Sequence, residues 1–497
     1  MKARRWWALG ALALSVLTIG FDTTILNVAL PTLGSAVHAT NSQLQWIVDA
    51  YVLVFAGLLL PAGALGDRYG RKRLLLIGLA LFGGASVIGA LVQSPGQLIA
   101  VRAALGIGAA ILTPITLAVL PVLFDEKERG KAVALVTMGI GLGIPLGPLV
   151  GGYLLKHFWW GSIFLVNIPA AVIALLAVAL LVPESRDPSG ARVDLLGGVL
   201  STVGLVAFVY GIIEAPDRGW GDPLVLGSLA VGVGLIGAFV AWQRRAANPM
   251  IDLRLFGNPR FLWGSLAATV ASFALFGILF ALPQYLQLVR GNDALGSGVR
   301  LLPLIGGLFL AAPLVPRLVS AVGSKIPVAL GMVVIAVGLA WGSLTRVDTG
   351  YGQVAAWLAT TGVGTGLALV PAMDAVLGAL PPERAGSGSA LTMTMRQVGG
   401  ALGVAILGSV LAGAYAAQAP AAAGDSLPVA AVVAAKTGDL GILVAGQHAY
   451  LHAMDRVLLV CAVVALVGAV LTAVFLPARE VRPRDEEESA HELARVA

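Results

Sequence analysis

Apolar runs of about 20 residues follow one another along nearly the whole chain, and this pattern leaves few possible folds. Such a run is what a helix needs to cross the hydrocarbon core of a bilayer. Only 12% of the 497 side chains are charged and 58% are hydrophobic, whereas soluble domains carry about 25% charged residues. The polar surface is too small for a water-soluble globule, so soluble enzymes, collagen-like chains and disordered chains are excluded. We therefore predict an all-α polytopic membrane protein.

Charged residues divide the apolar runs into fourteen expected spans. In chain order they cover 6–31, 44–65, 74–92, 98–121, 132–155, 161–182, 194–214, 223–243, 260–288, 298–316, 326–344, 353–378, 386–414 and 455–476. The only long loop, 415–454, is rich in Ala, Gly and Pro and joins the last two spans. The first run continues past Pro31 without a small-residue cleavage site, so we expect a retained span and not a signal peptide.

The basic residues are distributed unevenly between the two sides of the expected membrane. With a cytoplasmic N-terminus, 23 of the 32 Lys and Arg residues fall in cytoplasmic segments and seven in outer loops. Cytoplasmic loops of membrane proteins carry such an excess, so the bias predicts that both termini are cytoplasmic. The net charge of +6 then reflects topology and not a nucleic-acid partner. We expect a multi-pass protein of the cytoplasmic membrane that acts as a monomer and binds no nucleic acid.

The sequence lacks the residue patterns that other kinds of membrane protein need. The single cysteine, Cys461, excludes a disulfide framework, and no Cys/His cluster predicts a metal site. No GxxxxGK(S/T) phosphate loop is present, which excludes an ATP-driven exporter. A membrane enzyme would need a metal or nucleophile constellation, which is not found, and no histidine lies deep in a span. We expect no cofactor and no enzymatic activity.

Two distant stretches share a pattern of glycine and proline. Span 4 contains Gly106-Ile107-Gly108 followed by Pro114, and span 12 contains Gly362-Val363-Gly364 followed by Pro371. The loops after these spans each contain a Glu-Arg pair, and the two pairs are 255 residues apart. Two halves of six spans with two spans inserted between them give this offset; the alternative is coincidence in Gly- and Ala-rich helices. Repeated halves are typical of secondary transporters, whose sites lie near the bilayer midplane between the halves.

This interpretation divides the chain into four parts. We expect an N-terminal six-helix bundle at 1–185, two linker helices at 186–250, a C-terminal six-helix bundle at 251–478 and a disordered cytoplasmic tail at 479–497. The tail mixes basic and acidic residues, as solvated chain ends do.

The loop after span 2 is dense in glycines and charges. It reads Gly63-Ala64-Leu65-Gly66-Asp67-Arg68-Tyr69-Gly70-Arg71-Lys72-Arg73. A tight turn at Gly70 would direct Arg71 and Lys72 toward a neighbouring helix end, while Asp67 would pair with an Arg or a helix N-terminus. The alternative is a positive-inside anchor only. The segment resembles the signature loop of the major facilitator superfamily, GxxxD(R/K)xGRK, which implies roles in conformational gating for Gly63, Asp67, Arg68, Gly70 and Arg71.

Further segments resemble the fourteen-span drug:proton antiporters of that superfamily, and the likeness covers nearly the whole chain. The segment Asp22–Pro31 is similar to DxTxxNxALP, and Gly143–Gly152 resembles the antiporter signature GxxxGPxxGG. Arg102–Gly108 is similar to RxxxGxG, although Leu105 stands where a Gln is usual. The resemblance implies a major facilitator fold, with two six-helix bundles and two inserted central helices.

The resemblance also implies proton-coupled export of lipophilic drugs by alternating access, driven by the proton gradient. The segment Trp46–Tyr51 in span 2 resembles the same segment in the subgroup that exports quaternary ammonium compounds and other lipophilic cations. Asp49 carries most of that likeness. Two alternatives remain open. One is an exporter of an endogenous antibiotic or lipid, and the other is a proton symporter for a nutrient.

Three charged residues fall inside spans of the first half. A charged side chain at the bilayer centre costs about 2.5–3.5 kcal/mol on insertion scales, so it is normally paired or functional. Asp22, Asp49 and Arg102 lie about 13, 9 and 6 Å from the outer ends of their spans. Our hypothesis is that Asp22 carries the proton, Arg102 tunes its pKa and Asp49 attracts the cationic substrate. The alternative is a structural ion-pair network.

Other residues are candidates for the substrate site. Phe273, Phe276 and Phe280 recur at helical spacing in span 9 and would stack on an aromatic cation, unless they face lipid. Arg396 lies deep in span 13 and needs a partner or an aqueous cavity. We expect Asp374, near the cytoplasmic end of span 12, either to contact the substrate or to extend to the membrane–water interface. The remaining candidates are Asn27 and Tyr285.

The glycines of span 5 have a mechanical interpretation. Gly143, Gly147, Gly151 and Gly152 would let two helices approach closely, and the prolines, including Pro148, would bend the helix. We expect this helix to pack on span 8 or its neighbour across the repeat interface and to seal one route through the membrane. Ordinary close packing is the alternative.

Overall fold

The computed structural model describes residues 2–186, 193–246, 248–380 and 385–477, which fold almost entirely as helices. Thirteen of these helices are long and apolar enough to cross a bilayer. A further helix, α5 (Glu126–His157), is bent by 45° between Gly143 and Leu146 and makes a fourteenth crossing when counted as one span. The bend includes Pro145, whose backbone nitrogen cannot donate the helical hydrogen bond. The predicted tail at 479–497 lies outside the described residues.

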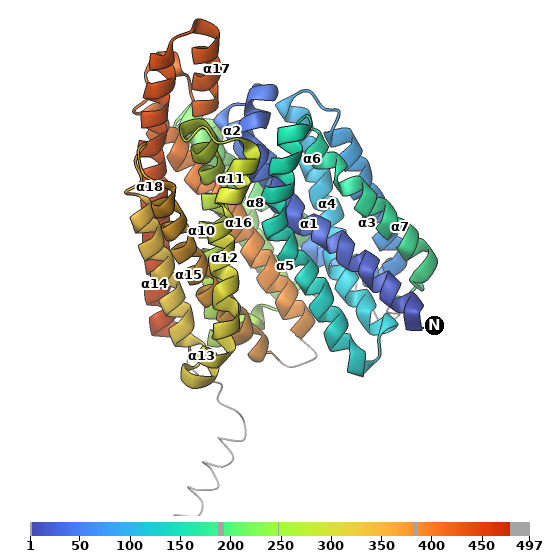
Figure 1. Ribbon diagram of the computed structural model, residues 1–497. Coiled ribbons are helices and arrows are strands. Elements are labelled where there is room, and N and C mark those ends of the chain that lie inside the picture. Colours follow the sequence, from blue (N-terminus) through green and yellow to red (C-terminus); the bar gives the residue numbers. More distant parts are fainter. Residues whose placement is uncertain (1, 187–192, 247, 381–384, 478–497) are drawn as a thin grey trace, which may run out of the picture.

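The first half of the chain forms six crossings (Figure 1). They are built from α1 (Lys2–Ala36), α2 (Asn41–Tyr69), α3 (Arg71–Gly89), α4 (Pro95–Leu123), α5, the short α6 (Ser162–Leu165) and α7 (Asn167–Leu181). Polar residues in the loops begin these helices. Thr40 and Gln43 form a reciprocal capping box at the start of α2, and Ser94 caps α4.

The second half contains more short elements. In chain order, its described elements are η1 (Leu253–Gly257), α10 (Pro259–Gln284), the π-helical η2 (Tyr285–Val289), α11 (Ala294–Arg300), α12 (Leu302–Ala311), η3 (Ala312–Leu314), α13 (Val315–Val322), α14 (Lys325–Gly342), α15 (Tyr351–Gly378), α16 (Ala385–Ala416), η5 (Ala421–Ala423), α17 (Leu427–Thr437) and α18 (Leu440–Phe475). The span between η2 and α14 is broken where Pro303, Pro313 and Pro316 interrupt the apolar run.

Equivalent helices pair in the same way in the two halves. α1 packs along α5 as α10 packs along α16, and α4 lies between α2 and α3 as α15 lies between α12 and α14. A Cβ added at Gly106 would lie 2.6 Å from the Tyr51 carbonyl oxygen in α2, and Gly362 approaches the Leu304 carbonyl of α12 in the same way. These equivalent contacts favour a structural repeat over coincidence.

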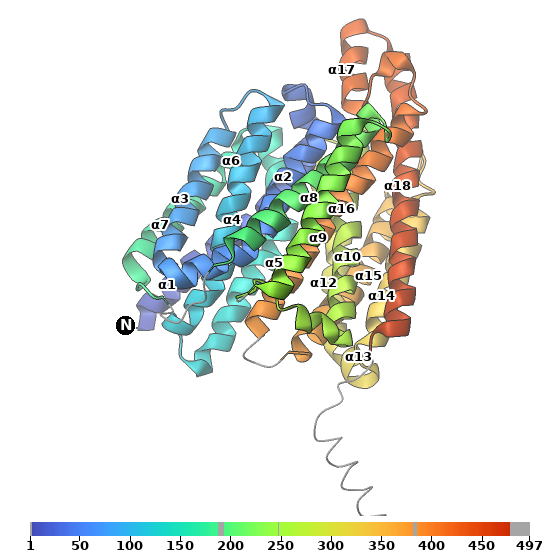
Figure 2. The same cartoon turned by 180° about the vertical axis from the view of Figure 1, so that it is seen from behind.

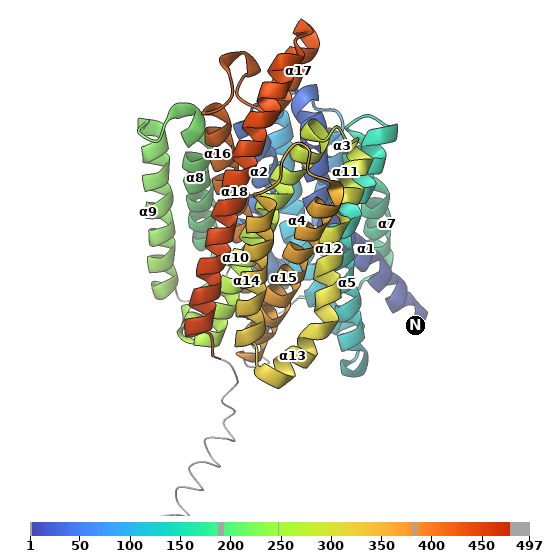
Figure 3. The same cartoon turned by 60° about the vertical axis from the view of Figure 1, so that its left-hand side comes forward.

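The two inserted helices, α8 (Leu195–Arg218) and α9 (Pro223–Arg245), lie on one side of the molecule (Figures 2 and 3). α8 packs on both α2 and α16, and α9 packs on α8. Only 17% of the apolar window of α9 is buried. The helices that are central in the sequence are therefore peripheral in space.

The segment predicted as a loop at 415–454 is mostly helical. α18 begins at Leu440 and not near residue 455, and α17 packs beside its first turns. Asp439 accepts a hydrogen bond from the Gly441 amide and so begins α18 early. Both helices project beyond the neighbouring helices at the upper end of Figure 1, which is opposite the end where α1 begins. The prediction of a loop was wrong here because the apolar run at 440–454 was too short to count as a span.

Candidate functional site

Asp22 and Arg102 form a buried ion pair between α1 and α4. The Arg102 Nη1 donates to Asp22 Oδ2 at 2.7 Å, and both side chains are 1% exposed. The amide nitrogen of Asn167, at the start of α7, donates to Asp22 Oδ1 at 3.1 Å and to Ser86 Oγ at 3.3 Å. Both oxygens of the Asp22 carboxylate are therefore occupied. The sequence predicted that Asp22 and Arg102 both lie inside spans of the first half, and the structure brings them into contact.

Arg102 is also held by α2. Its Nε donates to the Ile47 carbonyl oxygen at 3.0 Å, and its guanidinium carbon lies 4.3 Å from the centre of the Tyr51 ring. A guanidinium over an aromatic face is a favourable cation–π contact, and it is stronger where water is excluded. Arg102 thus joins three helices of the first half.

Asp49 lies between Ile47 and Tyr51 in the sequence but belongs to a different face of α2. It is fully buried, and in the described part of the chain no donor reaches either of its carboxylate oxygens. Gln45, one helical turn earlier, contacts Gly408 of α16. Because residues four apart share a helix face, Asp49 lies on the side of α2 that faces α16, where the two halves meet.

The aromatic candidates of α10 lie inside the protein. Phe273 and Phe280 are 8% and 1% exposed, and a Cβ at Gly400 of α16 would lie 3.1 Å from the Phe276 ring. Phe273 and Phe276 approach α16 and Phe280 is buried, so the three do not form a lipid-facing stripe. Tyr285 is fully buried with its hydroxyl unpaired among the described residues, and the Asn27 amide nitrogen donates to the Thr23 carbonyl at 3.4 Å.

Arg396 and Asp374 occupy different environments. The Arg396 Nε donates to Ser272 Oγ of α10 at 3.3 Å, and no carboxylate pairs with this arginine among the described residues. Counted at 1.5 Å per residue from the contact between Gln45 and Gly408, Arg396 lies about 12 Å from Asp49 along the direction of the helices. This distance is too long for a direct ion pair between the two side chains. Asp374 is exposed near the end of α15. The structure does not bring Asp374 to the buried carboxylates.

The glycines of α5 pack mainly on α1 and not on span 8, which corrects one expected partner, whereas Gly152 makes the other expected contact, across the interface between the halves. A Cβ at Gly143 would lie 2.6 Å from the Leu17 carbonyl oxygen, and Gly147 and Gly151 meet Thr24 and Ile25 of the same helix. Gly152 instead faces α11, where a Cβ would lie 2.6 Å from the Leu295 Cα. The neighbours are therefore α1 and α11 and not α9, which is span 8.

The upper ends of the two halves are in contact. Lys156 Nζ lies 2.9 Å from Asp293 Oδ2, linking the end of α5 to the start of α11. Near it, Gly298 of α11 approaches the carbonyl oxygen of Pro148. The Gln287 side-chain amide donates to the Val28 carbonyl at 2.7 Å. These contacts join the two halves at the upper end of Figure 1.

The signature loop joins α2 to α3 at the lower end. Gly70 has a φ of 111°, a left-handed value that favours glycine, and Arg71 Nη2 lies 2.7 Å from Asp67 Oδ1. Lys72 reaches the Ala179 carbonyl in the last turn of α7 at 2.7 Å, as the turn predicted. A Cβ at Gly63 would lie 3.5 Å from Pro114, and the Arg68 guanidinium lies 5.4 Å from the Tyr69 ring centre.

The sequence reasoning missed Asn167 and Ser86, which complete the Asp22 site. An amide inside the apolar run 161–182 was the available signal, since a buried polar group needs a partner. Among the described residues, no three potential metal ligands cluster. The side chains gathered here are suited to binding protons and cations.

Comparison with known proteins places this geometry in a family. Residues 12–404 match the family model of the Major Facilitator Superfamily. Over 83% of this chain and 77% of its own length, the tetracenomycin C resistance and export protein of Streptomyces glaucescens is 33% identical. The methyl viologen resistance protein SmvA of Salmonella typhimurium is 34% identical over 84% of both chains. The multidrug efflux pump LfrA of Mycolicibacterium smegmatis is 35% identical over 85% of this chain and 84% of its own length.

Solved structures agree with this assignment at the level of the fold. A bacterial homologue of the human lysosomal transporter Spinster, in an inward-facing and unoccupied conformation, superposes with a TM-score of 0.68 at 18% identity. The match covers 97% of this chain and all of that chain. The chain is a multi-pass membrane protein that belongs to the major facilitator superfamily, a family of transporters and not of enzymes.

Proposed function

We propose that the protein exports lipophilic, cationic drugs across the cytoplasmic membrane in exchange for protons, as a monomer and without a cofactor. The relatives described above are drug resistance, export and efflux proteins. Both termini would be cytoplasmic, because the signature loop and the basic end of α9 lie at the end of the molecule where α1 begins.

The observation that carries this proposal is the buried carboxylate of Asp49, which has no hydrogen-bond partner among the described residues. A buried charge without a partner is strongly unfavourable, so the site is completed by a proton or by a cation. Both ligands neutralise the same group, and therefore each excludes the other. Because Asp49 lies where α2 meets α16, a change in the distance between the halves changes access to it.

Asp22 has a different environment, which bears on our hypothesis that it carries the proton. Its carboxylate is already compensated by Arg102 and Asn167. Asp22 can exchange a proton only when this pair opens, whereas Asp49 needs no such step. We propose that Asp49 is the shared site for proton and cation, and that the Asp22–Arg102 pair couples occupancy of that site to the movement of α1.

A transport experiment on reconstituted protein separates these roles. Proteoliposomes with an imposed proton gradient would be given methyl viologen, tetraphenylphosphonium or a neutral drug, with wild type, Asp22→Asn and Asp49→Asn compared. We expect Asp49→Asn to abolish cation-induced proton release and cation transport. Equal cation transport by Asp49→Asn and wild type, or transport that persists without the gradient, would overturn the proposal.

The Asp22→Asn variant distinguishes the two assignments. If Asp49 is the shared site, this variant still binds the cation and releases a proton but turns over slowly. If Asp22 carries the proton, binding persists and proton release is lost. Membrane insertion of each variant is checked by its amount in purified membranes.

A second candidate function is export of an antibiotic that the cell itself makes. The observation that favours it is the 33% identity to the tetracenomycin C resistance and export protein of Streptomyces glaucescens. A resistance panel in a pump-deficient host, with cations, neutral drugs and antibiotics compared, would separate it from general cation export.

A further inference from the structure

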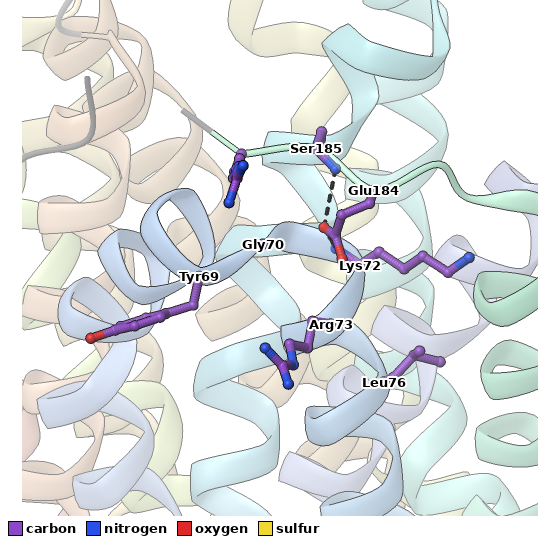
Figure 4. A pocket seen from close by; sticks show the side chains of 8 residues that line it. Tyr69, Gly70, Lys72, Arg73, Leu76, Glu184 and Ser185 are labelled. Carbon is purple, nitrogen blue, oxygen red and sulfur yellow. Dashed lines mark hydrogen bonds between the residues drawn. The ribbon is translucent and has the colours of Figure 1, made fainter. Parts of the chain in front are cut away.

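A depression at the lower end of the first half contains an excess of positive charge (Figure 4). It has a volume of about 780 Å³ and lies between the start of α3 and the segment after α7. Lys72, Arg73 and Arg186 supply three positive charges, and Glu184 supplies one negative charge. Arg73 and Arg186 are exposed, and neither pairs with a carboxylate in the described ranges.

The negative charge in the depression is already engaged by the backbone. Glu184 Oε1 accepts hydrogen bonds from the Lys72 amide at 3.1 Å and from the Ser185 amide at 3.0 Å. Lys72 is also engaged, since its ammonium donates to the Ala179 carbonyl. Among the described residues, the two arginines are thus the groups with unused donors, and the guanidinium fork is well suited to phosphate oxygens.

The depression adjoins a surface that faces lipid. Only 39% of the apolar window is buried in α3 and likewise in α7. Ile77 is 49% exposed and lies one helical turn, about 6 Å, beyond Arg73 along α3. Leu180, in the last turn of α7, is 67% exposed. Tyr69, 55% exposed at the rim, is the kind of side chain found at membrane interfaces.

We propose that this depression binds the phosphate of an anionic phospholipid, with Arg73 and Arg186 contacting the headgroup and the acyl chains lying on α3 and α7. Basic pockets between transmembrane helices are known to take anionic headgroups. The apolar surface directly beyond the charges favours a lipid over a soluble phosphate, which would leave it uncovered. This inference does not depend on the transported substrate.

The test measures phosphatidylglycerol bound to the full-length protein by native mass spectrometry in detergent, with phosphatidylcholine as the zwitterionic comparison of zero net charge. Each Lys or Arg beside an anionic surface strengthens binding about fivefold, so Arg73→Gln with Arg186→Gln should weaken phosphatidylglycerol binding about 25-fold. Arg73→Gln alone should weaken it about fivefold. The matched control is Arg244→Gln with Arg245→Gln, which removes two exposed charges from the end of α9, outside the depression.

Equal weakening by the control pair would overturn the proposal, because it would show that any two basic residues serve. Unchanged binding in the Arg73/Arg186 pair would overturn it as well. A third arm adds inorganic phosphate: displacement of phosphatidylglycerol by millimolar phosphate would mean an anion site without lipid selectivity. Persistence of lipid binding in phosphate is the expected result.

Discussion

The first six crossings and the last six are packed by equivalent helix pairs, but they differ in their buried charges. In the first half, α1 and α4 carry Asp22 and Arg102 as an ion pair with Asn167 beside it. In the second half, α16 carries Arg396, whose described partner is the Ser272 hydroxyl of α10. Small residues set the packing in both halves, whereas among the described residues the buried carboxylates, Asp22 and Asp49, lie only in the first half.

The loops after the second crossing of each half differ in the same way. Asp67 and Arg71 form an ion pair in the first half. Ser320 and Ser324 occupy the corresponding places, where the Ser320 hydroxyl donates to the Arg317 carbonyl at 2.9 Å. The second half therefore keeps the turn, at Gly323, but has serines in the places of the Asp67–Arg71 pair.

The largest effect is expected from breaking the buried ion pair. Arg102→Met leaves Asp22 buried without its cation, which destabilises by about 3–5 kcal/mol where buried pairs have been broken. Arg396→Met should have a clearly smaller effect, because among the described residues no carboxylate pairs with Arg396 and would be left alone. Thermal unfolding of the two variants in one detergent is the measurement. Equal destabilisation would contradict the difference between the halves.

Overpacking the glycine contacts tests what the halves share. Gly147→Leu and Gly403→Leu each place a side chain against the backbone of the paired helix, α1 or α10, and should destabilise by about 1–3 kcal/mol. The matched controls are Gly141→Leu on α5 and Gly413→Leu on α16, which have open space around them. We expect transport to fall with Gly147→Leu while the protein stays in the membrane. If Gly147→Leu and Gly403→Leu differed in stability as much as Arg102→Met and Arg396→Met do, a shared packing role of the two glycines would be refuted.

Most of the fold followed from the sequence because apolar length and charge placement determine where helices cross a membrane. The predicted spans and the glycine repeat correspond to observed helices and contacts. The start of α18 was missed because the turns at 440–454 extend beyond the bilayer-length run that the prediction counted. Helix length outside a membrane is set by caps such as Asp439 and by packing on α17.

The charged residues of the site were predictable one by one from the sequence, but the contacts between them were not. Intramembrane charge identified Asp22, Asp49 and Arg102, since burial of any of them demands an explanation. Periodicity alone did not show that Arg102 pairs with Asp22 and leaves Asp49 facing the other half. Which face of a helix meets which neighbour depends on tertiary packing, and so does the contribution of Asn167 from α7.

The Asp67–Arg71 pair of the signature loop should contribute little to stability. The two side chains are 38% and 20% exposed, so solvent weakens their attraction, and Asp67→Asn should cost less than about 1 kcal/mol. Thermal unfolding of Asp67→Asn and Arg102→Met, measured in the same detergent, gives the difference in stability between the two variants. A loss as large as that of Arg102→Met would mean that the loop, and not the buried pair, distinguishes the first half.

The smallest effect concerns pH at the upper contact between the halves. The hydrogen bond from Lys156, followed by that from the Gly296 amide, lowers the pKa of Asp293 from its ordinary value of 3.8. A lowered pKa in the folded state means that the contribution of Asp293 is present above pH 3.8 and is lost only as the pH falls below it. Asp293 therefore stays ionised from pH 5 to 8, and Asp293→Asn should leave the shape of the transport–pH profile in that range unchanged. Transport rates of wild type and variant, measured across this range at a fixed pH difference, check this. A changed profile would place a titrating group where the halves meet at the upper end, and would weaken the assignment of proton exchange to the buried carboxylates of the first half.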